Sequence, residues 1–127
     1  MGLDMYLVVE KRNDFDGVYH EEIAYWRKAN HIHRWFVENV QNEQDDCKMY
    51  PVSREQLEHL LHVCSETLND PSTSHYTLPA LAGPFFGETS YDEWYYQDVS
   101  YTAQVCKTIL ALFNFKSDAR LLYYSWW

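Results

Sequence analysis

Glycine and proline are scarce in this chain, which holds four of each among its 127 residues. Phosphate-binding loops built on glycine backbone need several closely spaced glycines, so such loops are excluded. The GxSxG and HExxH patterns are absent as well. The sequence therefore offers no recognised catalytic or zinc-binding motif, and we favour a non-enzymatic protein with neither cofactor nor metal.

Cysteine is also rare, and the three cysteines form no CxxC pair. An odd number of cysteines without such a pair is typical of reduced thiols in a cytoplasm and disfavours a disulfide framework. No apolar run approaches the roughly 18 residues of a membrane span, and Asp4 makes the N-terminus too acidic for a signal peptide. We therefore expect a cytoplasmic protein without membrane contact.

Basic residues are outnumbered, because 10 Lys and Arg stand against 19 Asp and Glu, which gives a net charge of −9. Such a surface repels nucleic acid and anionic membranes, so direct nucleic-acid binding is disfavoured. The same surface can attract a basic protein partner.

Aromatic residues, in contrast, are abundant at 17%, and hydrophobic residues reach 46%. Each buried Phe or Trp removes roughly 150–250 Å² from water, so a few of them supply most of a core. The length fits a single domain, residues 1–127. Because Tyr and Trp also line interfaces, their surplus is compatible with a homo-oligomer.

The first third of the sequence predicts a hairpin and a helix. Residues 3–11 alternate as a strand does, and Asp16-Gly17 is typical of a hairpin turn that leads into a second strand over residues 18–24. From about residue 26 to residue 40 the apolar period becomes helical. The predicted buried stripe of this helix comprises Ala29, Ile32, Phe36 and Val40.

The remainder predicts two further helices and two further strands. A short strand over residues 47–52, with Pro51 at a sheet edge, precedes a capping box at residues 53–56 that starts a helix. A long loop over residues 71–88 leads to a second capping box at residues 90–93, a helix to about residue 114 and a strand over residues 120–127. The expected inward positions are Leu57, Leu60, Leu61, Cys64 and Leu68 on one helix, and Tyr95, Asp98, Thr102, Val105, Cys106, Ile109 and Leu112 on the other.

These elements define an α+β fold class, with three helices packed on a small, mostly antiparallel sheet. The predicted order is β-β-α-β-α-loop-α-β. No internal repeat and no low-complexity tract interrupts it.

Six segments stand out by their order and spacing: MGLDMYL at 1–7, YWRKANHIHRWFVENVQ at 25–41, DDC at 45–47, YPVSREQLEHLL at 50–61, FFG at 85–87 and YDEWYYQD at 91–98. Together they resemble a family of small uncharacterised proteins from bacteriophages, prophages and their hosts. Members of that family end in a Tyr-x-Ser-Ser-Trp-like strand, whereas this chain ends in YSWW and lacks the second Ser. The resemblance brings no established reaction, but it implies a phage context, and hence the bacterial cytoplasm, and it favours host manipulation or defence evasion.

A basic and aromatic segment carries the main functional signal, because residues 23–37 hold three of the ten basic side chains and no acidic one. Arg27 and Lys28 are predicted near the start of a helix, where free backbone N–H groups and the helix dipole favour an anion. Trp26 beside them can stack on a planar ring. The alternative interpretation buries Trp26 in the core and pairs the arginines with acidic residues.

Asp98 lies on the apolar stripe of the third helix, which is unusual for a carboxylate. Either it faces the basic segment and orients a cation, or a slight rotation of the helix exposes it to solvent. Aromatic neighbours on the same helix would complete the wall of a site. The predicted ligand-binding residues are Trp26, Arg27, Lys28, Asn30, Arg34, Trp94, Tyr95 and Asp98.

Three functions fit these observations. The leading hypothesis is a phage-derived, non-enzymatic binding protein that captures a small anionic ligand of nucleotide type as a counter-defence. The alternative is an acidic inhibitor that covers a basic groove on a host nuclease or another host defence protein. The third is a small nucleotide-processing enzyme.

Overall fold

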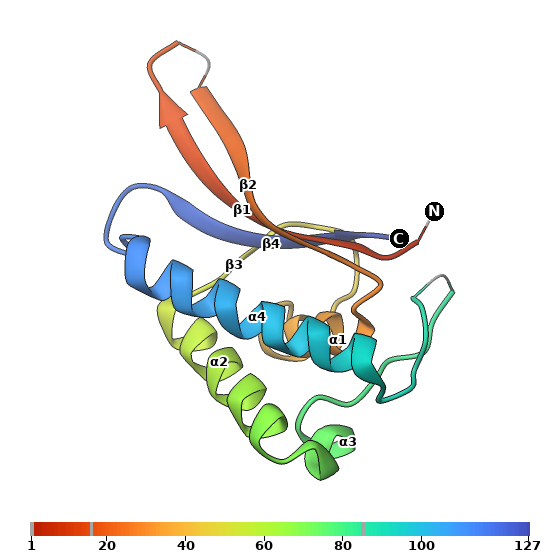
Figure 1. Cartoon of the computed structure of the whole chain (residues 1–127). Helices are drawn as coiled ribbons and strands as arrows, with labels where there is room; N and C mark the ends of the chain where they lie inside the picture. The colour runs from red at the N-terminus through yellow and green to blue at the C-terminus, as the bar shows by residue number, and fades with distance from the viewer. Residues whose placement is uncertain (1, 16, 85) are drawn as a thin grey trace.

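A four-stranded antiparallel sheet forms one layer of the protein, and helices form the other (Figure 1). The computed structural model describes residues 2–15, 17–84 and 86–127. The strand order is β2-β1-β4-β3. The elements are β1 (Asp4–Asn13), β2 (Gly17–Arg27), α1 (Asn30–Asn39), β3 (Tyr50–Pro51), α2 (Arg54–Asn69), the 3-10 turn η1 (Pro71–Thr73), α3 (Ser74–Thr77), α4 (Glu93–Leu112) and β4 (Arg120–Trp126).

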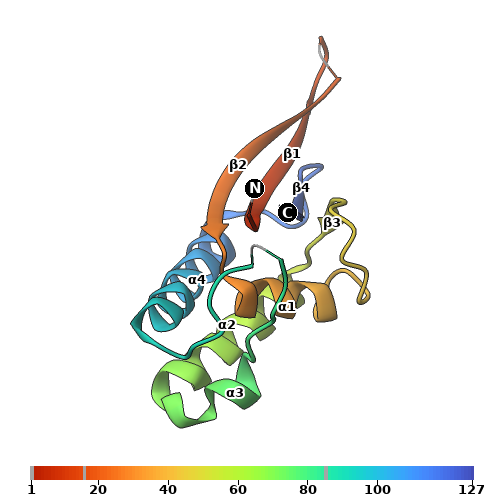
Figure 2. The same cartoon turned by 90° about the vertical axis from the view of Figure 1, so that its right-hand side faces the viewer.

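The predicted α+β class is confirmed, since α1, α2 and α4 all lie on the same face of the sheet (Figure 2). The segment predicted as a loop over residues 71–88 contains two short helical turns, η1 and α3. Among the described residues, none of the helices has the length and apolar character that crossing a bilayer requires.

Alternation along β1 and β4 builds the core. Met5 and Leu7 of β1 and Tyr123 of β4 are fully buried beneath the helices, and the ring of Tyr123 stacks on Phe36 of α1 at a centroid distance of 3.8 Å. Sequence alternation therefore predicted the inward face of β1 correctly. The predicted pairing of the aromatic C-terminal strand within the sheet is also confirmed.

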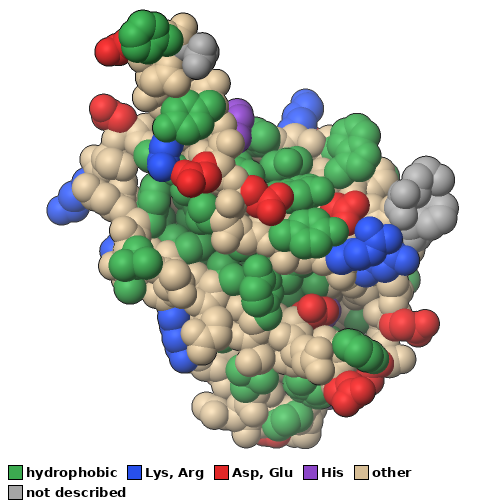
Figure 3. Space-filling model, turned by 45° about the horizontal axis from the view of Figure 1, so that its top comes forward, with side chains coloured by type: hydrophobic (Ala, Val, Ile, Leu, Met, Phe, Trp, Pro, Cys, Tyr) green, Lys and Arg blue, Asp and Glu red, His purple; other side chains and the backbone are tan. Residues whose placement is uncertain are grey.

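The opposite face of the sheet carries a row of tyrosines across three strands. Tyr6 of β1 lies between Tyr25 of β2 and Tyr124 of β4, with ring centroids 5.3 Å and 4.7 Å away. Hydrophobic side chains on the surface of this part of the molecule are interspersed with charged ones (Figure 3).

The predicted start of the first helix is wrong by about one turn. Trp26 and Arg27 continue the ladder between β1 and β2, opposite Met5 and Asp4, and α1 begins only at Asn30. The reason is that the alternation of the second strand and the helical period overlap at these residues, and pairing with β1 decides the outcome. The predicted stripe of Ala29, Ile32, Phe36 and Val40 is buried as expected.

The strand predicted over residues 47–52 is reduced to Tyr50–Pro51, and further errors lie at helix ends. Leu68 and Leu112 are exposed rather than inward, and Thr67 takes the buried place in the last turn of α2, where its hydroxyl lies 2.5 Å from that of Thr77. The N-cap of α4 is Asp92, the third residue of the capping box predicted at residues 90–93 rather than its first, and its carboxylate accepts from the backbone N–H of Tyr95. The capping box of α2 at Ser53 is confirmed.

The β1–β2 hairpin extends beyond the rest of the sheet (Figure 1). β4 pairs with β1 only as far as Glu10, whereas β1 and β2 stay paired to Asn13 and Gly17. Asp16 of the predicted turn lies outside the described residues, and Gly17 beside it has a φ of +78°, as tight hairpin turns require.

Candidate functional site

A pocket of about 390 Å³ lies where the end of β2 and the first turns of α4 meet the loop before α4. We call it the polar pocket. Its lining residues are Arg27, Lys28, His31, Gly87, Glu88, Ser90, Asp92, Trp94, Tyr95, Gln97 and Asp98.

Five of the eight residues predicted from the sequence line this pocket. Arg27 and Lys28 come from the end of β2, and Trp94, Tyr95 and Asp98 come from the first turns of α4, more than 60 residues later. Trp94 exposes 66% of its surface, so its indole is available to a ligand, whereas Tyr95 is almost fully buried. The fold thus brings two cations and an aromatic ring to one concave surface.

Trp26 and Asn30 do not line the pocket but hold the elements that form it in place. The buried indole of Trp26 donates to Thr102 Oγ1 at 2.9 Å, and Thr102 in turn donates to the backbone carbonyl of Asp98 at 2.6 Å. The stacking role predicted for Trp26 is therefore wrong, because the ring belongs to the core. Its hydrogen bond instead links β2 to the α4 turn that carries Asp98.

Asn30 fixes the loop that forms one side of the polar pocket. Its buried amide donates to the carbonyls of Phe86 and Glu88 at 3.1 and 2.8 Å and accepts from the N–H of Leu81 at 2.9 Å. All three contacts are to backbone, so Asn30 holds the loop independently of its side chains.

Arg34 does not belong to the site. Its guanidinium bonds Glu38 at 3.0 Å and the carbonyl of Ala80 at 3.0 Å, and it lines a separate pocket of about 210 Å³. The alternative interpretation, in which the arginines pair with acidic residues, therefore holds for Arg34, and the prediction that Arg34 binds the ligand is wrong.

The polar pocket is not purely basic, because Glu88, Asp92 and Asp98 line it together with the two cations. Arg27 also shares its charge with Asp4, whose carboxylate lies 3.3 Å from Nη1. The site is therefore mixed in charge, with cations from β2 and the residue after it, and carboxylates from the loop before α4 and from α4, of which only Asp98 was predicted.

Two buried groups of the pocket are electrostatically unusual. Burial, reinforced by the charge of Asp92, raises the pKa of Asp98 to about 6. Burial also lowers the pKa of His31 to about 4, so this imidazole is neutral at physiological pH. His31 stacks on Tyr95 at 4.1 Å, and its Nε2 has no hydrogen-bond partner among the described residues.

Replacing Asp98 with asparagine should stabilise the protein at neutral pH and not in acid. Because the pKa of Asp98 is raised in the folded state, its ionisation opposes folding above that pKa. Allowing for solvent screening, Asp98→Asn should raise the free energy of unfolding by about 1–2 kcal/mol at about pH 7.5. The gain should shrink as the pH falls through 6 and vanish below the unfolded-state pKa near 3.8. Urea unfolding of the wild-type protein and of Asp98→Asn between about pH 3.8 and 7.5 measures this gain in stability. A gain that does not change with pH would contradict the raised pKa of Asp98.

Lys28 and Gly87 meet at the mouth of the polar pocket. Lys28 adopts a left-handed φ of +55°, and its backbone N–H donates to the carbonyl of Leu3 at 2.7 Å. A Cβ on Gly87 would lie 2.9 Å from the Cβ of Lys28, and the φ of Gly87 is +94°. The close approach holds the Lys28 backbone against the loop before α4.

Gly87→Ala should lower the free energy of unfolding by about 2–3 kcal/mol, because it adds a steric clash to an unfavourable φ. Gly17→Ala is the matched control, since Gly17 has a φ of +78° but nothing within 4 Å of the added Cβ. The control should cost only about 1 kcal/mol for the backbone conformation. Equal losses in chemical denaturation would show that the contact with Lys28 is unimportant.

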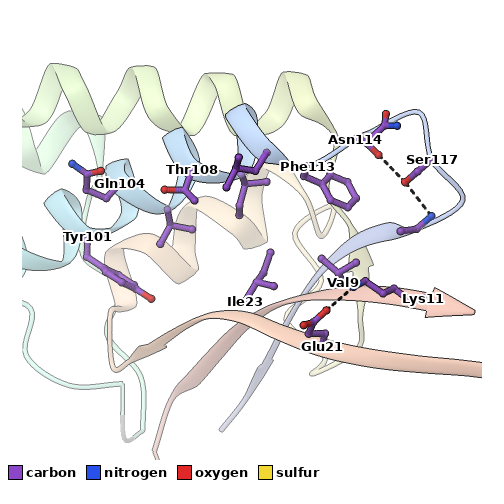
Figure 4. A pocket seen from close by; sticks show the side chains of 14 residues that line it. Val9, Lys11, Glu21, Ile23, Tyr101, Gln104, Thr108, Phe113, Asn114 and Ser117 are labelled. Carbon is purple, nitrogen blue, oxygen red and sulfur yellow. Dashed lines mark hydrogen bonds and ion pairs between the residues drawn. The ribbon is translucent and has the colours of Figure 1, made fainter.

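A second, larger cavity of about 650 Å³ lies between the projecting hairpin and α4 (Figure 4). We call it the hairpin groove. Its floor is apolar, with Val9 and Ile23 facing Phe113, and at its rim Lys11 pairs with Glu21 at 2.7 Å. The charged groups of the groove neutralise each other. In the polar pocket, by contrast, no described residue donates to the carboxylate of Asp98 or bonds Nε2 of His31, so this pocket is the stronger indication of a ligand.

A buried polar network was missed by the sequence analysis. Nδ1 of His33 lies 2.7 Å from the hydroxyl of Tyr123, and Nε2 lies 3.0 Å from both oxygens of Asp45, which also accepts from Trp127 at 3.0 Å. Burial alone would raise the pKa of Asp45, but the hydrogen bonds from His33 and Trp127 lower it overall. Since His33 and Tyr123 are fully buried, this network serves structure. Its partners lie 12 and 90 residues from His33, so no local pattern could reveal it.

No known family model, curated protein or solved structure matches the chain. The resemblance to bacteriophage proteins therefore stays a prediction. In residues 2–15, 17–84 and 86–127, no group of three or more His, Cys, Asp or Glu side chains is placed to hold a metal ion.

Proposed function

We propose that the protein binds a small ligand of nucleotide type in the polar pocket, without catalysis. The observation that supports this proposal is the convergence of Arg27 and Lys28 with Trp94 on one cavity of about 390 Å³. Arginine and lysine are suited to a phosphate, and an exposed indole is suited to a planar base. Given the resemblance to phage proteins, the biological form of the proposal is capture of a nucleotide-type host signal.

The mixed charge of the pocket narrows the class of ligand. A purely anionic ligand would meet Glu88, Asp92 and Asp98 as well as the two cations. A nucleotide places its negative charge at one end and hydrogen-bond donors on its sugar and base at the other, which suits a pocket that holds both cations and carboxylates.

Titration calorimetry with a panel of linear and cyclic nucleotides tests the proposal. Trp94→Ala should weaken binding by about 10- to 100-fold, the usual worth of stacking one base on an aromatic ring. Trp126→Ala is the matched control, because Trp126 has the same exposed fraction of 66% and lies on β4 outside the pocket. Arg27→Ala should also weaken binding by at least about tenfold. Absence of heat with every nucleotide would refute the proposal.

A second candidate, an acidic inhibitor of a basic protein, is supported by the hairpin. β2 is an edge strand, and its residues from Gly17 to Ile23 are all exposed. Its outer edge is open to a partner strand, and the side chains of Val18, Tyr19 and Ile23 are exposed along it. Ile23 also lines the hairpin groove, so a basic partner that adds a strand here could place a side chain in the groove.

This candidate predicts a bacterial partner whose retention on the immobilised protein falls steeply with salt and is abolished by Ile23→Glu. Nucleotide binding should be unaffected by that substitution, because Ile23 lies outside the polar pocket. If the amount of partner retained changes neither with salt nor with Ile23→Glu, this candidate function is rejected.

A further inference from the structure

Asp98 lacks the hydrogen-bond donors that a half-buried carboxylate needs. Burial and the repulsion from Asp92 dominate its environment, and within the described part of the chain no donor to its side-chain oxygens is found. A partly buried carboxylate that receives no donor from the protein depends on solvent for its hydrogen bonds, so its place on the wall of a pocket makes it available to a ligand that carries donors.

The position of Asp98 relative to Trp94 defines which part of a ligand it meets. The two residues are four apart on α4 and therefore share a face of the helix, one turn from each other. Both line the polar pocket. A planar ring stacked on the indole of Trp94 presents its edge, rather than its face, to the carboxylate of Asp98.

The cations set the direction of the ligand along the pocket. Arg27 and Lys28 belong to the end of β2 and the residue after it, whereas Asp98 belongs to α4. A phosphate held by the cations leaves the base to reach α4. His31, which also lines the pocket, is neutral and adds no competing charge.

We infer that the polar pocket selects guanine among the nucleobases, through two hydrogen bonds from the guanine edge to Asp98. An ionised carboxylate only accepts hydrogen bonds, and its two oxygens match a pair of neighbouring donors. Guanine offers such a pair in N1–H and the N2 amino group. Adenine and cytosine place a donor beside an acceptor, and uracil offers one donor between two acceptors. This inference rests on the proposed function, because it concerns the same pocket.

Calorimetry with GMP, IMP, AMP and UMP at about pH 7.5, where Asp98 is ionised, tests the inference. GMP should bind at least about tenfold more tightly than AMP or UMP, as expected for two charge-assisted hydrogen bonds. IMP, which keeps N1–H but lacks the amino group, should lie between them. Asp98→Asn exchanges one acceptor for a donor, so the variant should lose the preference for GMP and bind AMP at least as well as GMP.

Two outcomes separate this inference from the proposed function. If the wild-type protein binds all four nucleotides equally, or if Asp98→Asn keeps the preference for GMP, base selection by Asp98 is overturned while nucleotide binding remains. If no nucleotide binds, the proposed function itself fails. Thermal unfolding of Asp98→Asn confirms that the variant is folded, so that a loss of selectivity reports on the site.

Discussion

Replacing His33 with alanine is expected to lower the free energy of unfolding by about 3–5 kcal/mol. The imidazole is fully buried and joins the hydroxyl of Tyr123 to the carboxylate of Asp45. An imidazole with its proton on Nε2 satisfies both partners, because it donates to Asp45 and accepts from Tyr123. Its removal leaves a cavity, a buried hydroxyl without a partner and a carboxylate with fewer donors. A loss of this size is a large part of the stability of a small domain.

Two further substitutions serve as controls for the loss of stability in His33→Ala. Tyr123→Phe keeps the ring stacked on Phe36 and removes only the hydroxyl, so it should cost about 1 kcal/mol. His62→Ala removes an imidazole of 70% exposed surface that pairs with Glu66, and should cost less than about 0.5 kcal/mol. Chemical denaturation of the three variants gives the comparison, and a loss below about 1 kcal/mol for His33→Ala would show that the network is dispensable.

Lys28→Gly is expected to weaken nucleotide binding without lowering the stability of the fold. The left-handed φ of +55° at Lys28 is unfavourable for a side chain but not for glycine, so the free energy of unfolding should stay constant or rise by up to about 1 kcal/mol. The same change removes one of the two cations of the polar pocket. Nucleotide affinity should therefore fall by about 10- to 100-fold, the worth of a charge-assisted hydrogen bond.

Glu43→Gly is the control for the backbone effect, because Glu43 also has a left-handed φ of +62° and is exposed in a loop outside the pocket. It should show the same change in stability with no change in nucleotide affinity by calorimetry. If Lys28→Gly loses stability instead, the side chain of Lys28 supports the fold through its contact with Gly87 and is not held there for a ligand.

Local patterns predicted the elements that depend on neighbouring residues. The capping box at Ser53 and the inward stripe of the first helix follow directly from side-chain chemistry and period, and Cys64 and Cys106 are buried core residues as expected. Burial accordingly raises the pKa of Cys106 to about 12. Local patterns failed at Trp26 and Arg27, where pairing with β1 outweighs the helical period that begins at the same point.

The candidate site was only partly predictable for the same reason. Asp98 was identified as a polar residue on an apolar stripe, and the structure places it in the polar pocket. Glu88 could not be assigned to the site, because nothing in its own surroundings reveals that the end of β2 packs across from it. Arg34 was assigned wrongly, since its nearest acid is one helical turn away and holds it elsewhere.

The projecting part of the β1–β2 hairpin should have a lower local stability than the four-stranded part of the sheet. As far as Glu10, β1 is held between β2 and β4, but beyond this point the ribbon has two strands and most of its residues are exposed. A two-stranded ribbon is marginally stable by itself, so its amides should exchange with deuterium through local opening. The amides of Met5 and Leu7 should exchange only when the whole domain unfolds. Residues 11–13 and 17–19 can thus separate and pair again many times during the lifetime of a single folded molecule.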